Sequence, residues 1–185
     1  MITRWTAYHE HWREEVGCVA VESDAGLLFF DPLDPPSEAD HTFITTFFHA
    51  RDARGRVWAP TSLVRRLRHR GVEVTDPFEP GDELPGGVRC FDTARNGEVV
   101  YWIPSEQALV VGDVLLGAGA KPHATSEPLR LAPENWLEGS TTKKLVKSLL
   151  PLLDLPVERI LLAHGDPVLQ SGKDVLKALN APDKA

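Results

Sequence analysis

Short apolar runs separated by glycine, proline and polar residues recur along most of the chain, and they predict a protein rich in β-strands. Residues 16–22 and 27–31 form two such runs, and the Ser-Asp-Ala-Gly between them places a glycine where a hairpin turn requires positive φ. Pro32, Pro35 and Pro36 then interrupt the pattern. Further short strands are predicted at residues 41–46, 57–59, 72–74, 87–91, 99–103, 108–111 and 159–163.

Three other segments repeat their apolar residues at the spacing of an α-helix. In the first, Thr61 is expected to cap the N-terminus and Gly71 to follow the C-terminus; in the second, Pro151 is expected to end or kink the helix. These helices are predicted at residues 61–71, 141–153 and 173–179. Residues 121–133 have no clear period and are predicted to form a surface loop.

The composition narrows the class of protein. At 185 residues, with 42% hydrophobic and 25% charged residues, the chain is typical of a soluble globular protein, and we expect residues 1–185 to form one domain. A net charge of -7 argues against a broad nucleic-acid-binding or membrane-binding surface, although it leaves room for a local basic patch.

The N-terminus lacks the pattern of a secretory signal, so the cytoplasm is the expected compartment. Cys18 and Cys90 lie in strand-like runs and are predicted to be buried, reduced thiols.

Three short sequences point to a known family. The stretch Thr45-Thr-Phe-Phe-His-Ala-Arg-Asp-Ala-Arg-Gly55 follows a predicted strand, and Gly112-Asp113 and His164-Gly165 come later. In this order they resemble the metallo-β-lactamase-like hydrolases, whose motif strand ends in Thr and is followed by His-x-His-x-Asp-His and a short step to Gly. The resemblance implies an α/β fold, a four-layer αββα sandwich. One departure is that the family usually has a helix before the motif strand, where residues 31–41 contain three prolines.

The same resemblance implies a two-metal site that has lost most of its ligands. When the family motif is aligned on Asp52, its three histidine positions carry side chains without a metal-binding atom. The histidine position in a later loop also carries such a side chain. These degenerate positions are Phe48, Ala50, Ala53 and Ala94. The first metal site of the family is therefore expected to be absent.

A reduced second site is the remaining candidate. Asp52 and His164 match ligand positions of the family and Asp113 matches its bridging position, so the resemblance implies one zinc, manganese or iron ion here, or none. The residues alone allow a plainer interpretation, in which Asp52 and Asp113 accept hydrogen bonds from loop amides.

Four further residues are candidates for the pocket. His49 is one position away from a ligand position of the motif, and His123 follows Asp113 in the proline-rich loop. Arg51 and Arg54 flank Asp52 and would replace lost metal charge or grip an anionic ligand, unless they are simply solvated loop residues.

Two hypotheses about function follow and both stay open. The first is a weak hydrolase with a single metal ion, acting on a reactive ester or thioester. The second is a non-catalytic protein that binds a small anionic ligand or a protein partner in the old cleft. Neither nucleic acid nor a membrane is an expected partner.

Overall fold

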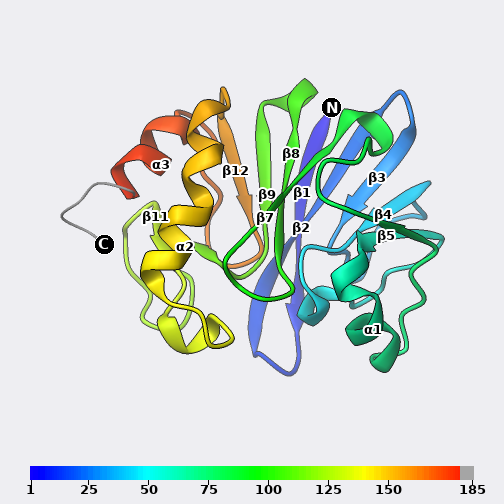
Figure 1. Ribbon diagram of the computed structural model, residues 1–185, viewed down its shortest axis with the longest axis horizontal. Helices are drawn as coiled ribbons and strands as arrows, with labels where there is room; N and C mark the ends of the chain where they lie inside the picture. Colours follow the sequence, from blue (N-terminus) through cyan, green and yellow to red (C-terminus); the bar gives the residue numbers. More distant parts are fainter. Residues whose placement is uncertain (180–185) are drawn as a thin grey trace.

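Two β-sheets packed face to face form the centre of the molecule, and helices cover both outer faces (Figure 1). The computed structural model describes residues 1–179, so the predicted end of the domain at residue 185 lies outside the described residues. The αββα layering expected from the resemblance is confirmed.

The first sheet has six strands in the order β1-β2-β3-β4-β5-β6. β1, β2 and β3 form an antiparallel meander, and β4, β5 and β6 continue the sheet in parallel. The strands are β1 (Ile2–His9), β2 (Glu14–Ser23), β3 (Gly26–Phe30), β4 (His41–Phe43), β5 (Arg56–Pro60) and β6 (Asp76–Phe78).

The second sheet has the order β12-β9-β8-β7, and its β9 and β12 run parallel to each other. The carboxyl ends of two parallel neighbours meet at one edge, so the residues that follow β9 and β12 lie close together. The strands are β7 (Arg89–Asp92), β8 (Val99–Ile103), β9 (Ala108–Val111) and β12 (Arg159–Leu162), and a separate pair is formed by β10 (Leu115–Gly117) and β11 (Leu129–Leu131).

Three apolar clusters hold the layers together. Between the sheets, Phe30 and Phe43 of the first sheet pack against Tyr101 of the second. The helix α1 (Thr61–His69) covers the first sheet through the cluster that contains Leu63 and Leu67. The second sheet is covered by α2 (Thr142–Leu149) and α3 (Gly172–Leu179). Each helix buries one apolar stripe, as its sequence period requires.

The predicted helix ends are partly right. Gly71 has φ +79° after the end of α1, and α2 ends at Leu149, before a 3₁₀ turn that contains Pro151. Thr61 was expected to cap α1, but Pro60 occupies that position and the Thr61 hydroxyl donates instead to the carbonyl of Phe78, 3.1 Å away. The hydroxyl therefore ties the helix to β6.

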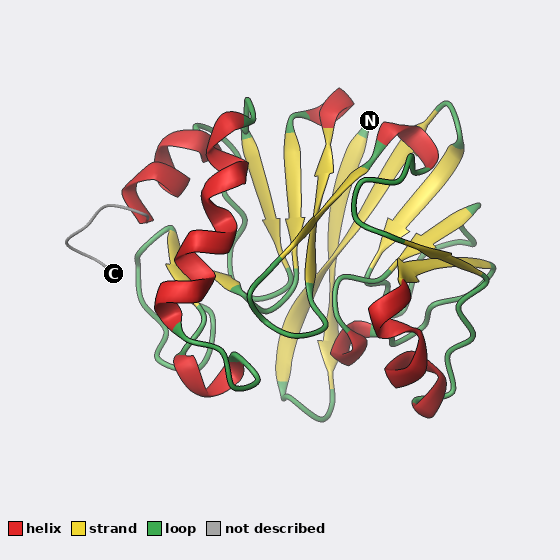
Figure 2. Cartoon of the chain, in the orientation of Figure 1, coloured by secondary structure: helices red, strands yellow, loops and turns green. Residues whose placement is uncertain are grey.

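Several strand predictions need correction. The strand expected at residues 72–74 is irregular, and the chain joins β5 only from Thr75 onward, where β6 follows. β1 was not expected, because its mixed polar and apolar residues lie at a half-exposed sheet edge. β11 falls within residues 121–133, which were predicted to be a loop. Residues 31–40 contain no helix, and Figure 2 shows this stretch as loop.

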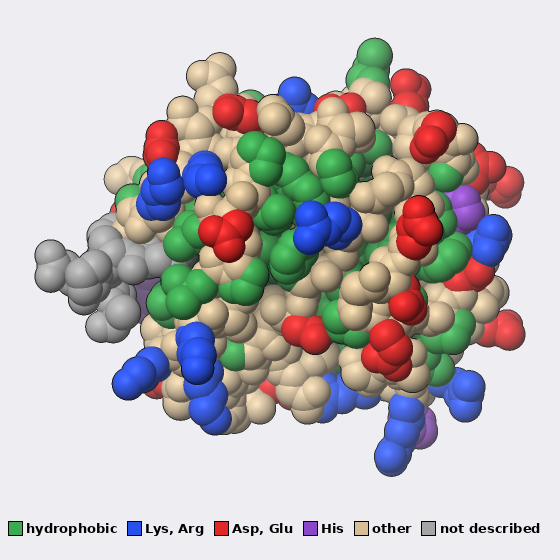
Figure 3. Space-filling view, turned by 45° about the horizontal axis from the view of Figure 1, so that its top comes forward, with side chains coloured by type: hydrophobic (Ala, Val, Ile, Leu, Met, Phe, Trp, Pro, Cys, Tyr) green, Lys and Arg blue, Asp and Glu red, His purple; other side chains and the backbone are tan. Residues whose placement is uncertain are grey.

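The surface shown in Figure 3 mixes acidic and basic side chains around a hydrophobic middle. Within residues 1–179, no helix is long and apolar enough to cross a membrane.

Candidate metal site

His49 is placed by a short 3₁₀ turn, Phe47–His49, just beyond the end of β4. Its imidazole is fully buried, and its Nδ1 lies 2.9 Å from Oδ2 of Asp31. Asp31 follows β3 and also accepts hydrogen bonds from the backbone N–H of Thr45, at 2.8 Å, and from the Thr45 hydroxyl. This carboxylate fixes the ring of His49 so that its Nε2 faces Asp113.

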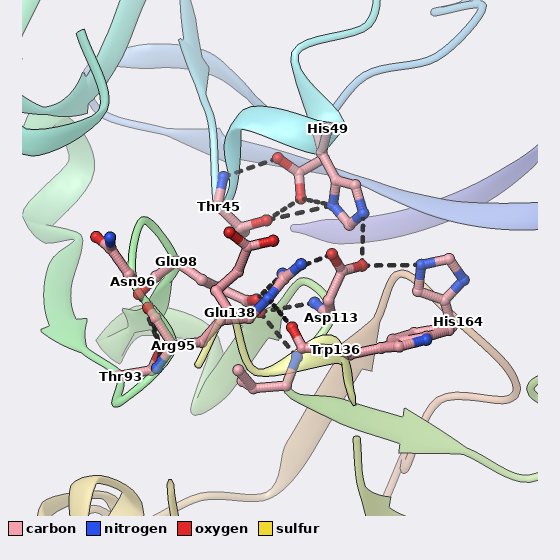
Figure 4. Close-up of polar contacts among 12 residues, drawn as sticks. Thr45, His49, Thr93, Arg95, Asn96, Glu98, Asp113, Trp136, Glu138 and His164 are labelled. Atoms are coloured by element: carbon pink, nitrogen blue, oxygen red, sulfur yellow. Dashed lines mark hydrogen bonds and ion pairs between the residues drawn. The ribbon is translucent and has the colours of Figure 1, made fainter. Parts of the chain in front are cut away.

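Asp113 and His164 follow the parallel strands β9 and β12, which bring them to the same sheet edge. Nε2 of His164 lies 3.0 Å from Oδ1 of Asp113, and Nδ1 of His164 lies 2.8 Å from Oε1 of Glu14, at the start of β2. Figure 4 shows His49 and His164 both directed at Asp113. Elements from both sheets therefore converge on one carboxylate.

These three residues have the geometry of a metal site. One ligand atom from each of His49, Asp113 and His164 lies within 4.8 Å of the others, and all three residues are buried. Each imidazole has a carboxylate behind its other nitrogen, a pattern that orients metal-binding histidines. Nε2 of His49 is 3.0 Å from Oδ1 of Asp113 without the geometry of a hydrogen bond, and this nitrogen can bind a metal ion when the imidazole is neutral. The residues present fit one divalent ion.

The opposite side of Asp113 is occupied by a guanidinium group. Arg95, 5% exposed, places Nη1 2.6 Å from Oδ2 of Asp113 and 2.6 Å from Oε2 of Glu98, while its Nε donates to the carbonyl of Trp136 at 2.7 Å. Oε1 of Glu98 accepts from the backbone N–H groups of Asp113 and Val114. In the family Asp113 would bridge two metals; here one of its oxygens faces the histidines and the other faces Arg95.

Burial and neighbouring charges shift the protonation of these groups. Burial favours the neutral carboxyl of Asp113, but the charge of His49 and hydrogen bonds from His164 outweigh it and hold the Asp113 pKa well below its usual value. Burial lowers the pKa of His164, but hydrogen bonds to Asp113 and Glu14 dominate and raise it to about 9. Burial, together with the charge of Asp113, raises the pKa of Glu98 to about 7 despite the opposing effect of Arg95.

A cavity of about 530 Å³ opens onto this centre. Its apolar walls include Trp12, Phe48 and Trp136, and its polar lining includes Arg95, Asp113 and His164. The Trp12 ring, from the turn between β1 and β2, lies 5.4 Å from the ring of His164. A volume of this size suits a small-molecule ligand.

The structure groups Asp113 and His164 with His49 and not with Asp52. Oδ2 of Asp52 accepts the backbone N–H of Asp34 at 2.8 Å, so this side chain ties together the loop after β3. In the alignment anchored on Asp52, His49 falls between two histidine positions of the family motif, and a shift of one residue in either direction places it on one of them.

The predicted pocket residues lie in different places. Arg51 is half-buried, with its guanidinium 5.3 Å from the Trp12 ring and one hydrogen bond to the carbonyl of Asp31. Arg54 is exposed, and only its carbonyl is engaged, by the hydroxyl of Thr42. His123 is exposed and does not line the cavity.

The four degenerate positions supply no ligand atom. Phe48 lines the cavity, and Ala50 and Ala53 pack in the cluster under α1. Ala94 packs against the core below α2, and its backbone N–H donates to the hydroxyl of Ser148. The residue after it, Arg95, is the one that enters the site.

Four residues of the centre were missed by sequence reasoning: Glu14, Asp31, Arg95 and Glu98. Two of them had a visible signal, because Asp31 and Glu98 are acids at the ends of apolar strands, where burial requires a partner. Glu14 carries no such signal, since its partner His164 is distant in sequence, and Arg95 lies in a polar loop where an arginine is ordinarily solvated, although its partner Glu98 is only three residues away.

Comparisons with known proteins agree on the fold. No family model and no curated protein matches the chain. Among solved structures, the metallo-β-lactamase from Pontibacter korlensis matches with a TM-score of 0.66 and 12% identity, covering 97% of this chain and 94% of the other. FIM-1 from Pseudomonas aeruginosa, a metallo-β-lactamase in its mono-zinc form, gives 0.62 and 13%, covering 97% and 89%. TTHA1623 in a di-iron-bound form gives 0.60 and 20%, covering 91% and 95%. At these identities the likeness shows a shared fold.

Proposed function

We propose that this chain, which has the metallo-β-lactamase fold, is a hydrolase-like protein that binds one divalent metal ion through His49, Asp113 and His164. The observation that carries the proposal is the pair of buried histidines, each backed by a carboxylate and both directed at Asp113. Two imidazoles and one carboxylate suit zinc, manganese or iron. Zinc and iron are the ions named for two of the similar structures.

The chemistry proposed is hydrolysis of a reactive ester or thioester in the cavity. A bound divalent ion polarises a carbonyl group and lowers the pKa of water. Glu14 and Asp31 hold the two imidazoles in place, and the aromatic walls formed by Trp12 and Trp136 exclude bulk water from the reacting group.

Activity is expected to be modest. Arg95 neutralises Asp113 where the family pattern would place a second metal ion, and its charge is half that of a divalent ion. Less of the negative charge that develops on the substrate is therefore stabilised. This restriction favours substrates with good leaving groups.

A non-catalytic role is the second candidate. It is favoured by the closure of the polar network without any metal, because Asp113 contacts both His164 and Arg95. In that case the cavity would bind a small anionic ligand or a partner.

Metal content separates the two. Protein purified without chelator is analysed by inductively coupled plasma mass spectrometry, together with His49→Ala, His164→Ala and Asp52→Asn. We expect about one ion per chain in the wild type, in keeping with a single three-residue ligand set. The ion should be lost from both histidine variants and kept in Asp52→Asn, because Asp52 only holds a loop.

Absence of metal from the wild type, even after incubation with zinc, manganese or iron, would remove the hydrolase proposal and leave the binding role. Loss of metal in Asp52→Asn alone would restore the alignment anchored on that residue.

A further inference from the structure

One amino group of the Arg95 side chain is not used by the polar network that holds this guanidinium. Nε donates to the carbonyl of Trp136 at 2.7 Å, and Nη1 lies 2.6 Å from Oε2 of Glu98 and 2.6 Å from Oδ2 of Asp113. Within the described part of the chain, no acceptor forms a hydrogen bond with Nη2, although the side chain is only 5% exposed. This nitrogen is not enclosed by protein atoms, so it faces open space.

The open space beside this amino group is the cavity of the candidate metal site. Arg95, Asp113 and Phe48 all line the cavity, and the ring centre of Phe48 lies 5.1 Å from the guanidinium carbon. Figure 4 shows this guanidinium next to the carboxylate at which His49 and His164 are directed. Buried N–H groups are nearly always paired, so the free donors of Arg95 take their partner from the contents of the cavity.

The other charged side chains that line the cavity have partners elsewhere. Oε1 of Glu14 lies 2.8 Å from Nδ1 of His164. Lys121 is exposed, and its ammonium group donates to a backbone carbonyl at 3.0 Å. Glu138 is also exposed and forms its ion pair with Arg66, at 3.9 Å. A ligand that reaches the buried end of the cavity therefore meets the free amino group of the guanidinium beside the central carboxylate.

From these contacts we infer that Arg95 is a catalytic residue, whose Nη2 donates to the carbonyl oxygen of the acyl group that is hydrolysed. The inference rests on the proposed function and names the residue that binds the reacting oxygen. As water adds to the acyl carbon, an electron pair of the C=O bond moves onto this oxygen. The pair returns as the bond to the alcohol or thiol breaks, and this leaving group takes a proton from the water.

The fixed position of the guanidinium is what makes it suitable for this role. Its contacts with Trp136, Glu98 and Asp113 hold it in place before a substrate arrives. A donor that is already oriented stabilises the charge on the carbonyl oxygen without a cost of reorganisation. The carboxylate formed by hydrolysis presents an oxygen at the same place, so the same amino group binds the product.

The first test uses acetate, the simplest such product, as the probe and needs no metal. Protein treated with chelator is titrated with acetate, and the side-chain N–H signals of Arg95 are followed by nuclear magnetic resonance. We expect these signals to shift and to saturate at millimolar acetate, because Nη2 gains a charge-assisted hydrogen bond.

Two variants identify the side chain responsible, with binding followed through the indole N–H signal of Trp136, which also lines the cavity. Arg95→Lys keeps a positive charge beside Asp113 but lacks the second amino nitrogen, and it should weaken acetate binding about tenfold. Lys121→Gln is the matched control, since it removes the other basic side chain of the lining that is long enough to reach a ligand. Its affinity should stay within about twofold of the wild type.

The second test is hydrolysis of p-nitrophenyl acetate by the protein loaded with metal. Arg95→Lys should lower kcat by about 100-fold at unchanged metal content, as for loss of one donor to the carbonyl oxygen. Lys121→Gln should hydrolyse this ester at the rate of the wild type.

Wild-type Arg95 signals that do not move with acetate would overturn the inference, and this measurement does not depend on the folding of a variant. Equal acetate binding by wild type and Arg95→Lys would overturn it too, as would loss of binding in Lys121→Gln. A protein that binds metal but not acetate keeps the proposed metal site and loses this role of Arg95. One that binds acetate through Arg95 but no metal keeps the contact and loses the proposed hydrolase.

Discussion

At the scale of single residues, two buried acids that were not foreseen hold the polar centre together. Asp31 orients His49, and Glu98 receives the backbone N–H groups of Asp113 and Val114 while binding Arg95. Buried carboxylates are tolerated only when they are paired and hydrogen-bonded. The centre is therefore a network in which each charge depends on its neighbours.

Among the residues of the centre, Arg95 is the one whose substitution should lower the stability of the protein most. Arg95→Met removes the counter-charge of two buried carboxylates, and we expect it to lower the free energy of unfolding by about 3–5 kcal/mol. The measurement is urea unfolding followed by tryptophan fluorescence, with Arg65→Met, at an exposed position of α1, as the control. A loss no larger than that of the control would show that Asp113 and Glu98 do not depend on this guanidinium.

At the scale of elements, the apolar pattern located most strands and helices, and it failed where the context was not local. The mixed residues of β1 form a strand because β2 is beside them. Thr61 was expected to cap α1, yet its hydroxyl turns to Phe78, a partner from another strand. Here a hydrogen bond to a residue distant in sequence replaces the local preference of threonine for capping the helix.

The two cysteines, both predicted to be buried, lie on strands; Cys18 is buried, Cys90 is only half-buried, and together they predict a dependence of stability on pH. Burial is the largest cause that raises the thiol pKa of Cys18, on β2, to about 11 and that of Cys90, on β7, to about 12. An unfolded thiol ionises near pH 9, so the folded chain holds these protons more tightly. Their contribution to stability is complete below about pH 9 and declines as the pH rises toward the folded values.

The check is labelling with a thiol reagent at pH 8, in buffer and in urea, and urea midpoints from pH 8 to 10. We expect slow labelling of the native protein, rapid labelling once unfolded, and midpoints that fall above about pH 9. Rapid labelling of native Cys18 would contradict its burial.

At the scale of the whole molecule, the contact between the two sheets creates the site. Asp31, His49 and Glu14 come from the first sheet and its loops, and Asp113 and His164 from the second. Tyr101 joins the sheets directly, because its buried hydroxyl donates to the carbonyl of Ile44 at 2.9 Å.

The two tyrosines of the chain offer a matched test of that contact. Tyr101→Phe leaves the Ile44 carbonyl without this donor, and we expect a loss of about 1–2 kcal/mol in the free energy of unfolding. Tyr8→Phe, at an exposed position, should change it by less than about 0.5 kcal/mol. Similar values for the two variants in urea unfolding would show that the hydrogen bond contributes nothing across the sandwich.

The sequence by itself determined most strands and helices, because apolar periodicity depends on neighbours along the chain. Its resemblance to the metallo-β-lactamase-like hydrolases implied the layers of the fold and pointed to Asp113 and His164, which follow two of these strands. Only the tertiary structure decided which residue of the motif loop joins them. The 3₁₀ turn, which no periodicity announces, brings His49 inward and leaves Asp52 to hold a loop.

The tertiary structure also decided which residue balances the charge of Asp113. An arginine was expected to replace the lost metal charge, and the expectation fell on Arg51 and Arg54 because they are adjacent to Asp52 in sequence. The structure brings Arg95 to Asp113 from another loop, 18 residues away along the chain. Electrostatic attraction acts through space, so a sequence can indicate that a counter-charge is needed, while only the packing of the two sheets decides which residue supplies it.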